Sequence, residues 1–103
     1  YYRRHLMIHE ATHCFMTTMP DVQAPAWYME GMAELFGTHR IEPDGRISFR
    51  VMPDDHAKFG GLGRIEMVRA DVASGRLLTL THLDRMRPDE FLENSSYGWA
   101  WAL

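Results

Sequence analysis

The segment His9-Glu10-Ala11-Thr12-His13 carries the residue types of a metal-dependent hydrolytic site. In a helix, residues i and i+4 lie about 40° apart and one turn along, so both imidazoles can reach one cation. Glu10 lies about 60° round the helix from His13, so its carboxylate can face a water at the metal without being a ligand. Chance gives about 0.02 occurrences of H-E-x-x-H at this composition, so composition alone rarely produces the motif. Two histidines at i and i+4 also occur on solvated helix faces, which is the alternative for the motif taken by itself.

A catalytic zinc takes three protein ligands, so the two histidines need one more. Sixteen residues separate His13 from Glu30, and Glu34 follows one helical turn later. We expect the helix that carries both carboxylates to fold back on the first, with Gly31 and Ala33 letting the two backbones approach closely. On spacing alone either carboxylate can be the third ligand, and a solvated acidic face is the alternative.

Two helices are predicted to position these residues. Nothing interrupts helix formation from Tyr2 to about Thr18, and Pro20 ends it. A second helix is expected from Ala26 to Phe36, between Pro25 and a capping Gly37. The first helix is expected to bury an apolar face, with its cysteine as a core thiol, made of Leu6, Ile8, Ala11, Cys14 and Phe15.

The rest of the chain predicts a small hairpin and packing helices. Apolar residues alternate with polar ones around the turn Pro43-Asp44-Gly45, which predicts a hairpin that uses Ile41, Ile47, Phe49 and Val51. One helix is predicted from the helical spacing of Leu62, Ile65, Val68 and Val72. Three further helices are expected to begin at the capping box Thr81-His82-Leu83-Asp84, at Pro88-Asp89-Glu90, and at Tyr97 after Asn94-Ser95-Ser96. The predicted fold class is therefore α+β, mainly helical.

The pair HEATH and PAWYMEGMAELF resembles the gluzincin metallopeptidases, in which H-E-x-x-H is followed by a Glu in an E-G-x-A context. The likeness is greatest to bacterial peptidase-MA-like domains of uncharacterised activity, over residues 5–37 and more weakly over 97–103. It implies a zincin-like catalytic fragment in which one zinc ion is bound by His9, His13 and Glu30. It also implies Glu10 as the general base and Glu34 as an acidic partner of a ligand histidine.

Tyr97 resembles the tyrosine of the Y-x-x-G helix in the aminopeptidase group of this family. That likeness implies a hydrogen bond from its phenol to the oxygen on which negative charge develops during hydrolysis. A buried core tyrosine is the alternative interpretation of Tyr97.

The function expected from these residues is zinc-dependent hydrolysis of peptide bonds, with Glu10 activating a water at the zinc. The chain would then be a metallopeptidase, a protease of the hydrolase class, and its partner a peptide or protein substrate. One alternative is a zinc-stabilised, catalytically inactive structural or peptide-binding domain. Another is a helical interaction module without metal. Glu10 favours the enzyme, because a structural zinc site has no use for a glutamate that is not a ligand.

The other histidines are expected to lie outside the site. His5 precedes His9 by one turn, but a triplet along one helix is too linear to surround a tetrahedral ion. His39, His56 and His82 are expected at the surface.

Composition limits the remaining classes of function. The chain has 103 residues, 46% of them hydrophobic, which allows one domain spanning residues 1–103. Because it starts at Tyr1 and ends on an apolar segment, we expect a partial domain whose remaining chain is a further partner. A net charge of −3 without a basic stripe disfavours nucleic acid, and no apolar run predicts a transmembrane segment. A lone Cys14 allows no internal disulfide and leaves the compartment open.

Overall fold

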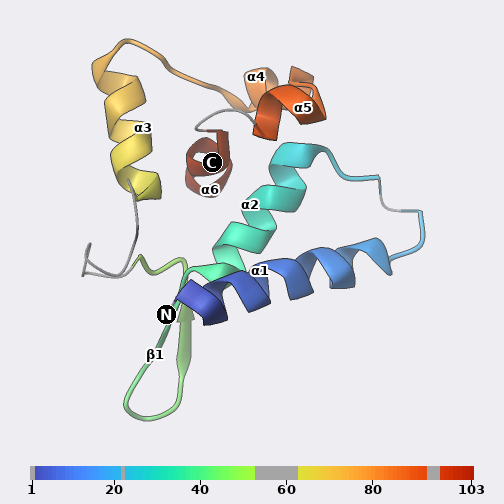
Figure 1. Cartoon of the computed structure of the whole chain (residues 1–103), viewed down its shortest axis with the longest axis vertical. Helices are drawn as coiled ribbons and strands as arrows, with labels where there is room; N and C mark the ends of the chain where they lie inside the picture. Colours follow the sequence, from blue (N-terminus) through green and yellow to red (C-terminus); the bar gives the residue numbers. More distant parts are fainter. Residues whose placement is uncertain (1, 22, 53–62, 93–95) are drawn as a thin grey trace.

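The computed structural model describes residues 2–21, 23–52, 63–92 and 96–103 of the chain. Within these ranges the fold is mainly helical with one small antiparallel sheet, as the sequence predicted. Helix α1 runs across α2, and α6 lies beside α2 and α3 (Figure 1). In chain order the elements are α1 (Tyr2–Thr17), α2 (Ala26–Gly37), β1 (His39–Ile41), β2 (Ile47–Phe49), α3 (Arg64–Ala73), α4 (Leu80–Arg85), α5 (Pro88–Leu92) and α6 (Ser96–Ala102).

The buried face of α1 carries its histidines, so the predicted apolar face was wrong. His9 and Met16 are the buried residues of this helix. Leu6 and Phe15 instead expose 43% and 62% of their surface, and Cys14 is exposed rather than a core thiol. A helix buries a single stripe, and Cys14 lies about 140° round from His9, so burying the imidazole turns the thiol outward.

Two glycines of α2 allow close approach to different neighbours. A Cβ on Gly31 would lie 2.8 Å from the carbonyl oxygen of Ala100 in α6, so this glycine makes room for α6 and not, as predicted, for α1. A Cβ on Gly37 would lie 3.0 Å from the imidazole of His5, so Gly37 is the residue that admits α1. Ala33, between them, is completely buried.

The hydrophobic core lies where α6 meets α4 and α5. Leu83, Phe91, Trp99 and Ala100 form its buried cluster, and Tyr97 packs against that cluster from the start of α6. Burying these four side chains is the main force that holds the short helices in place, because none of them is long enough to be stable alone.

Indole hydrogen bonds fix α6 against its neighbours. The Nε1–H of Trp99 donates to Oδ2 of Asp71 in α3 at 2.7 Å. The Nε1–H of Trp101 donates to Oγ1 of Thr38, directly after α2, at 3.0 Å. The middle of α6 is therefore tied to α3, and its C-terminal turn is tied to the residue that follows α2.

The hairpin pairs β1 with β2, with Ile41 opposite Ile47. Gly45 has φ of +85°, and its N–H donates to the carbonyl of Glu42, so the turn uses the glycine as the sequence predicted. Ile47 and Phe49 are exposed, which leaves the apolar side of β2 outside the core, and Val51 lies beyond the end of the strand.

The capping box of α4 lies two residues before the predicted one. The Oγ1 of Thr79 accepts from the backbone N–H of His82, and the His82 Nδ1 accepts from the backbone N–H of Thr79. The prediction starting at Thr81 was therefore wrong in register, because the helix already begins at Leu80. The predicted helix starting at Pro88 is confirmed.

Some predictions lie outside the described residues, namely those for His56, Leu62, Asn94 and Ser95. Among the helices that the structure describes, none has the length and apolarity needed to cross a membrane.

Candidate metal centre

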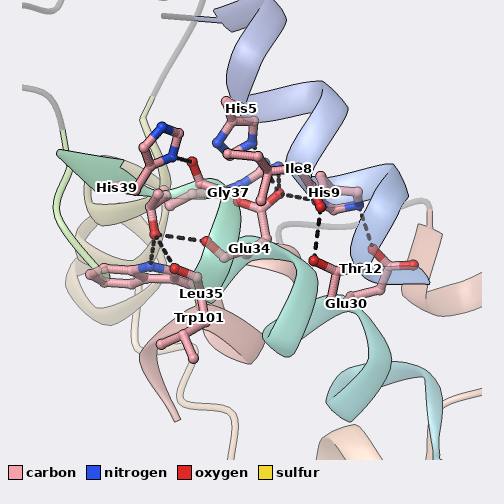
Figure 2. A network of polar contacts seen from close by, with 12 residues as sticks. His5, Ile8, His9, Thr12, Glu30, Glu34, Leu35, Gly37, His39 and Trp101 are labelled. Atoms are coloured by element: carbon pink, nitrogen blue, oxygen red, sulfur yellow. Dashed lines mark hydrogen bonds and ion pairs between the residues drawn. The ribbon is translucent and has the colours of Figure 1, made fainter. Parts of the chain in front are cut away.

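Three side-chain atoms from α1 and α2 converge on one point. The Nε2 atoms of His9 and His13 are 3.1 Å apart. The Oε2 atom of Glu30 lies 3.3 Å from Nε2 of His9 and 3.4 Å from Nε2 of His13. Figure 2 shows Glu30 reaching from α2 toward His9 on α1. The sequence prediction grouped the same three residues, and the structure brings them together as a group that could hold a metal ion.

The spacing of these atoms fits a tetrahedral cation. An ion with ligands at about 2.0–2.1 Å separates them by about 3.3–3.4 Å, which is close to the three edges measured here. The Oε2 of Glu30 is also buried and has no hydrogen bond within the described parts of the chain. Its contacts among these residues are with the two imidazole nitrogens, an arrangement that could hold a metal ion.

Glu34 lies on the other side of the His9 ring. Its Oε1 is 3.2 Å from Nδ1 of His9, so the imidazole has a carboxylate at each nitrogen (Figure 2). The side chain of Glu34 is 2% exposed, and such a carboxylate must be paired to remain charged. Contact with Nδ1 keeps a proton there, so the ring, once neutral, would present its Nε2 lone pair toward Glu30 and His13.

The structure adds Arg64, a residue that sequence reasoning missed. Its Nε donates to Oε2 of Glu34 and its Nη2 donates to Oε1, each at 3.0 Å. The guanidinium also lies 5.1 Å from the centre of the Tyr97 ring. Arg64 is 30 positions from Glu34, and no local motif marks it.

These contacts shift the pKa values of two groups in the metal-free protein. The carboxylates of Glu30 and then Glu34 raise the pKa of His9 to about 9, against burial, which lowers it. Burial alone would raise the pKa of Glu34, but hydrogen bonds from His5, His9 and Arg64 hold it well below its usual range. Glu34 is therefore an ionised carboxylate at neutral pH, and both of its oxygens accept hydrogen bonds from Arg64.

A second group, His5, His9 and Glu34, also meets the distance requirement for a metal. The Nε2 of His5 is 3.6 Å from Oε1 of Glu34. Both carboxylate oxygens of Glu34 already accept hydrogen bonds from Arg64, so their charge is compensated by that guanidinium. The group containing Glu30 is the better cation site, because its carboxylate oxygen lacks such a partner among the described residues.

Glu10 lies on α1 and Tyr97 on α6, and neither belongs to the group of candidate ligands. Burial is the largest cause that raises the pKa of the Tyr97 phenol, and the charges of Glu30, Glu34 and Glu10 raise it further, against Arg64. Tyr97 is therefore near enough to these carboxylates to be affected by their charge. Glu10 is exposed on α1, where its carboxylate is open to water. The roles assigned to both residues from sequence stay predictions.

The remaining histidines divide between buried and exposed positions. His39 is 4% exposed and its Nδ1 lies 2.8 Å from the carbonyl oxygen of Gly37, so the predicted surface position was wrong. The His39 ring is buried because β1 follows closely after α2, so that the ring lies against Gly37, the last residue of α2. His82 is exposed as predicted and caps α4.

The chemical properties of this site are inferred from the residues that form it. Comparison of the chain with protein-family models, with curated proteins and with solved structures found no match.

Proposed function

We propose that this chain is a zinc-dependent peptidase domain of the gluzincin type, which hydrolyses peptide bonds. The observation that carries the proposal is the triangle formed by Nε2 of His9, Nε2 of His13 and Oε2 of Glu30, with edges of 3.1, 3.3 and 3.4 Å. Two nitrogens and one carboxylate oxygen are the donor set of one major class of catalytic zinc sites, and they leave a coordination position for water.

In the proposed site the protein supplies the ligands, and the zinc ion supplies the Lewis acidity. When bound, zinc supplies Lewis acidity that makes water a nucleophile near neutral pH and polarises a carbonyl group. His9, His13 and Glu30 would hold the ion. Glu34 would keep the His9 ring in the tautomer that presents Nε2 to it.

Glu10 is the residue that distinguishes an enzyme from a structural site. It lies next to His9 on α1 but outside the ligand group, and its side chain is exposed. In the proposed reaction Glu10 accepts a proton from the attacking water and passes it to the nitrogen of the leaving amine. This role requires a carboxylate that reaches solvent beside the ion without binding the ion.

In the same proposed reaction, Tyr97 interacts with the substrate. Its phenol would donate a hydrogen bond to the carbonyl oxygen of the substrate as negative charge develops there. The raised pKa of Tyr97, caused first by burial, keeps the phenol protonated at neutral pH and therefore able to donate. Packing of α6 into the core holds the phenol in place.

The experiment that tests the proposed function replaces Glu10 by Gln in the zinc-loaded protein. We expect Glu10→Gln to keep one equivalent of zinc and to lose hydrolysis of a broad peptide library, followed by mass spectrometry. The amide has the shape of the carboxylate but cannot accept the proton. Glu42→Gln, in the hairpin, is the matched control and should cleave like the wild type.

Two outcomes would overturn the assignment. Full turnover by Glu10→Gln would remove Glu10 as the base. A zinc-loaded wild type that cleaves no peptide would favour the zinc-stabilised structural or peptide-binding domain instead.

A further inference from the structure

Arg64 is the one cation of the described chain that is bonded to both oxygens of the buried Glu34. Its Nε–Oε2 and Nη2–Oε1 distances are both 3.0 Å, a bidentate pair in the fork geometry that guanidinium and carboxylate share. The Glu34 oxygen that accepts from Nη2 is also the one that lies 3.2 Å from Nδ1 of His9. Arg64, Glu34 and His9 therefore form an unbroken line of contacts that ends at Nδ1 of His9, across the ring from the candidate ligand atom Nε2.

The backbone of Arg64 lies where α3 packs against α6. Arg64 is the first residue of α3, and a Cβ on Gly98 of α6 would lie 3.0 Å from its carbonyl oxygen. The absence of a side chain at Gly98 thus lets α6 pack directly against the first turn of α3. The hydrogen bond from Trp99 to Asp71 joins the same two helices further along.

The guanidinium of Arg64 also contacts Tyr97, the residue proposed to donate a hydrogen bond to the substrate. The Cζ of Arg64 lies 5.1 Å from the centroid of the Tyr97 ring, within the range of a cation–π contact. One side chain therefore contacts both the Glu34 carboxylate and the ring of Tyr97. A lysine could supply the charge but not two parallel N–H bonds together with a flat surface for the ring.

We propose that Arg64 is a positioning residue of the candidate metal centre, which holds Glu34 in the orientation that fixes the His9 ring. This inference rests on the proposed function, because it assigns Arg64 a role in zinc binding. Arg64 itself touches neither the ion nor the substrate. Its effect on zinc must therefore pass through Glu34.

The test measures zinc affinity of the folded full chain by competition with a chelator. We expect Arg64→Gln to weaken zinc binding by about 10-fold and Glu34→Gln by about 10–100-fold. The double variant should bind zinc no more weakly than Glu34→Gln alone, because Arg64 acts through that carboxylate. Arg69→Gln, an exposed arginine of the same helix, should bind zinc like the wild type.

A second readout separates positioning from general structural damage. In the zinc-loaded protein, NMR should show the Nδ1 proton of His9 exchanging with water faster in Arg64→Gln than in Arg69→Gln. Arg64→Lys should restore part of the affinity, because it keeps the charge but loses the fork. Unchanged affinity in Arg64→Gln, additive losses in the double variant, or full rescue by Lys would each overturn the proposal.

Failure of the proposed function gives a different result. If the folded wild type binds no zinc, both the peptidase assignment and the role of Arg64 in zinc binding are wrong. The pairing of Arg64 with Glu34 is then tested in the protein without zinc. A double-mutant cycle on the unfolding equilibrium tests that pairing. Additive effects of Arg64→Gln and Glu34→Gln there would also overturn the contact, whereas strong coupling would keep Arg64 as the partner that positions Glu34.

Discussion

The imidazole of His9 lies between two carboxylates, with Glu34 Oε1 3.2 Å from Nδ1 and Glu30 Oε2 3.3 Å from Nε2. The two carboxylates differ in their partners, although they are one helical turn apart on α2. Glu34 is bonded through both oxygens to Arg64, whereas Glu30 Oε2 has no hydrogen bond among the described residues and also faces His13. For the proposed zinc site, this asymmetry favours Glu30 as the ligand and Glu34 as the partner of the His9 ring.

The first prediction compares these two glutamates by zinc affinity. Glu30→Gln removes the proposed ligand and should weaken zinc binding by more than Glu34→Gln, for which we expect about 10–100-fold. The reason is that losing a partner of a ligand disturbs its orientation, whereas losing a ligand removes a metal bond. Competition titration on both variants, with Glu42→Gln as control, gives the order. A larger loss for Glu34→Gln would reverse the assignment.

The second prediction concerns protons released when zinc enters. The pKa of His9 is raised to about 9 in the metal-free protein, chiefly by the Glu30 carboxylate, so at about pH 7.5 the ring carries an extra proton. Zinc binds the neutral imidazole, so uptake must release that proton, and apparent affinity should rise with pH until about 9. Calorimetry in buffers of different ionisation enthalpy should report close to one proton per zinc from His9. A binding enthalpy independent of buffer would contradict this.

The third prediction tests the role of Tyr97. Tyr97→Phe keeps the ring that packs on Phe91 but removes the hydroxyl. If the phenol stabilises the developing oxyanion, kcat should fall by about 10²–10³ while zinc content and unfolding temperature stay unchanged. Steady-state kinetics and thermal unfolding of the same preparation provide the comparison. A nearly intact kcat would make Tyr97 a packing residue of the core.

The sequence predicted what helix geometry determines locally. The i and i+4 spacing of His9 and His13, and of Glu30 and Glu34, is set by the helical repeat, so both pairs fall on one face wherever the helices lie. The length of the connection then allows α2 to fold back on α1. The helical starts at Ala26 and Pro88 were predicted because proline and its neighbours act on the backbone directly.

What the sequence did not predict depends on packing between distant segments. Nothing near Arg64 indicates that it pairs with Glu34, because the contact arises only when α3 packs on α6. The rotation of α1 was misjudged for a related reason: apolar residues such as Phe15 suggested the inner face, but the paired charges of α2 keep the histidines inside. Gly31 was assigned to the wrong neighbour because its partner, Ala100, lies far along the chain.

The measurement that tests the central claim most directly is the zinc content of the folded protein after reconstitution and removal of unbound metal. The account predicts one equivalent per chain in the wild type and in His82→Ala, whose histidine lies away from the site, and little zinc in His13→Ala. Circular dichroism on each sample establishes that the chain is folded. Well under one equivalent of zinc in folded wild type, or full retention by His13→Ala, would contradict a metal centre built from His9, His13 and Glu30.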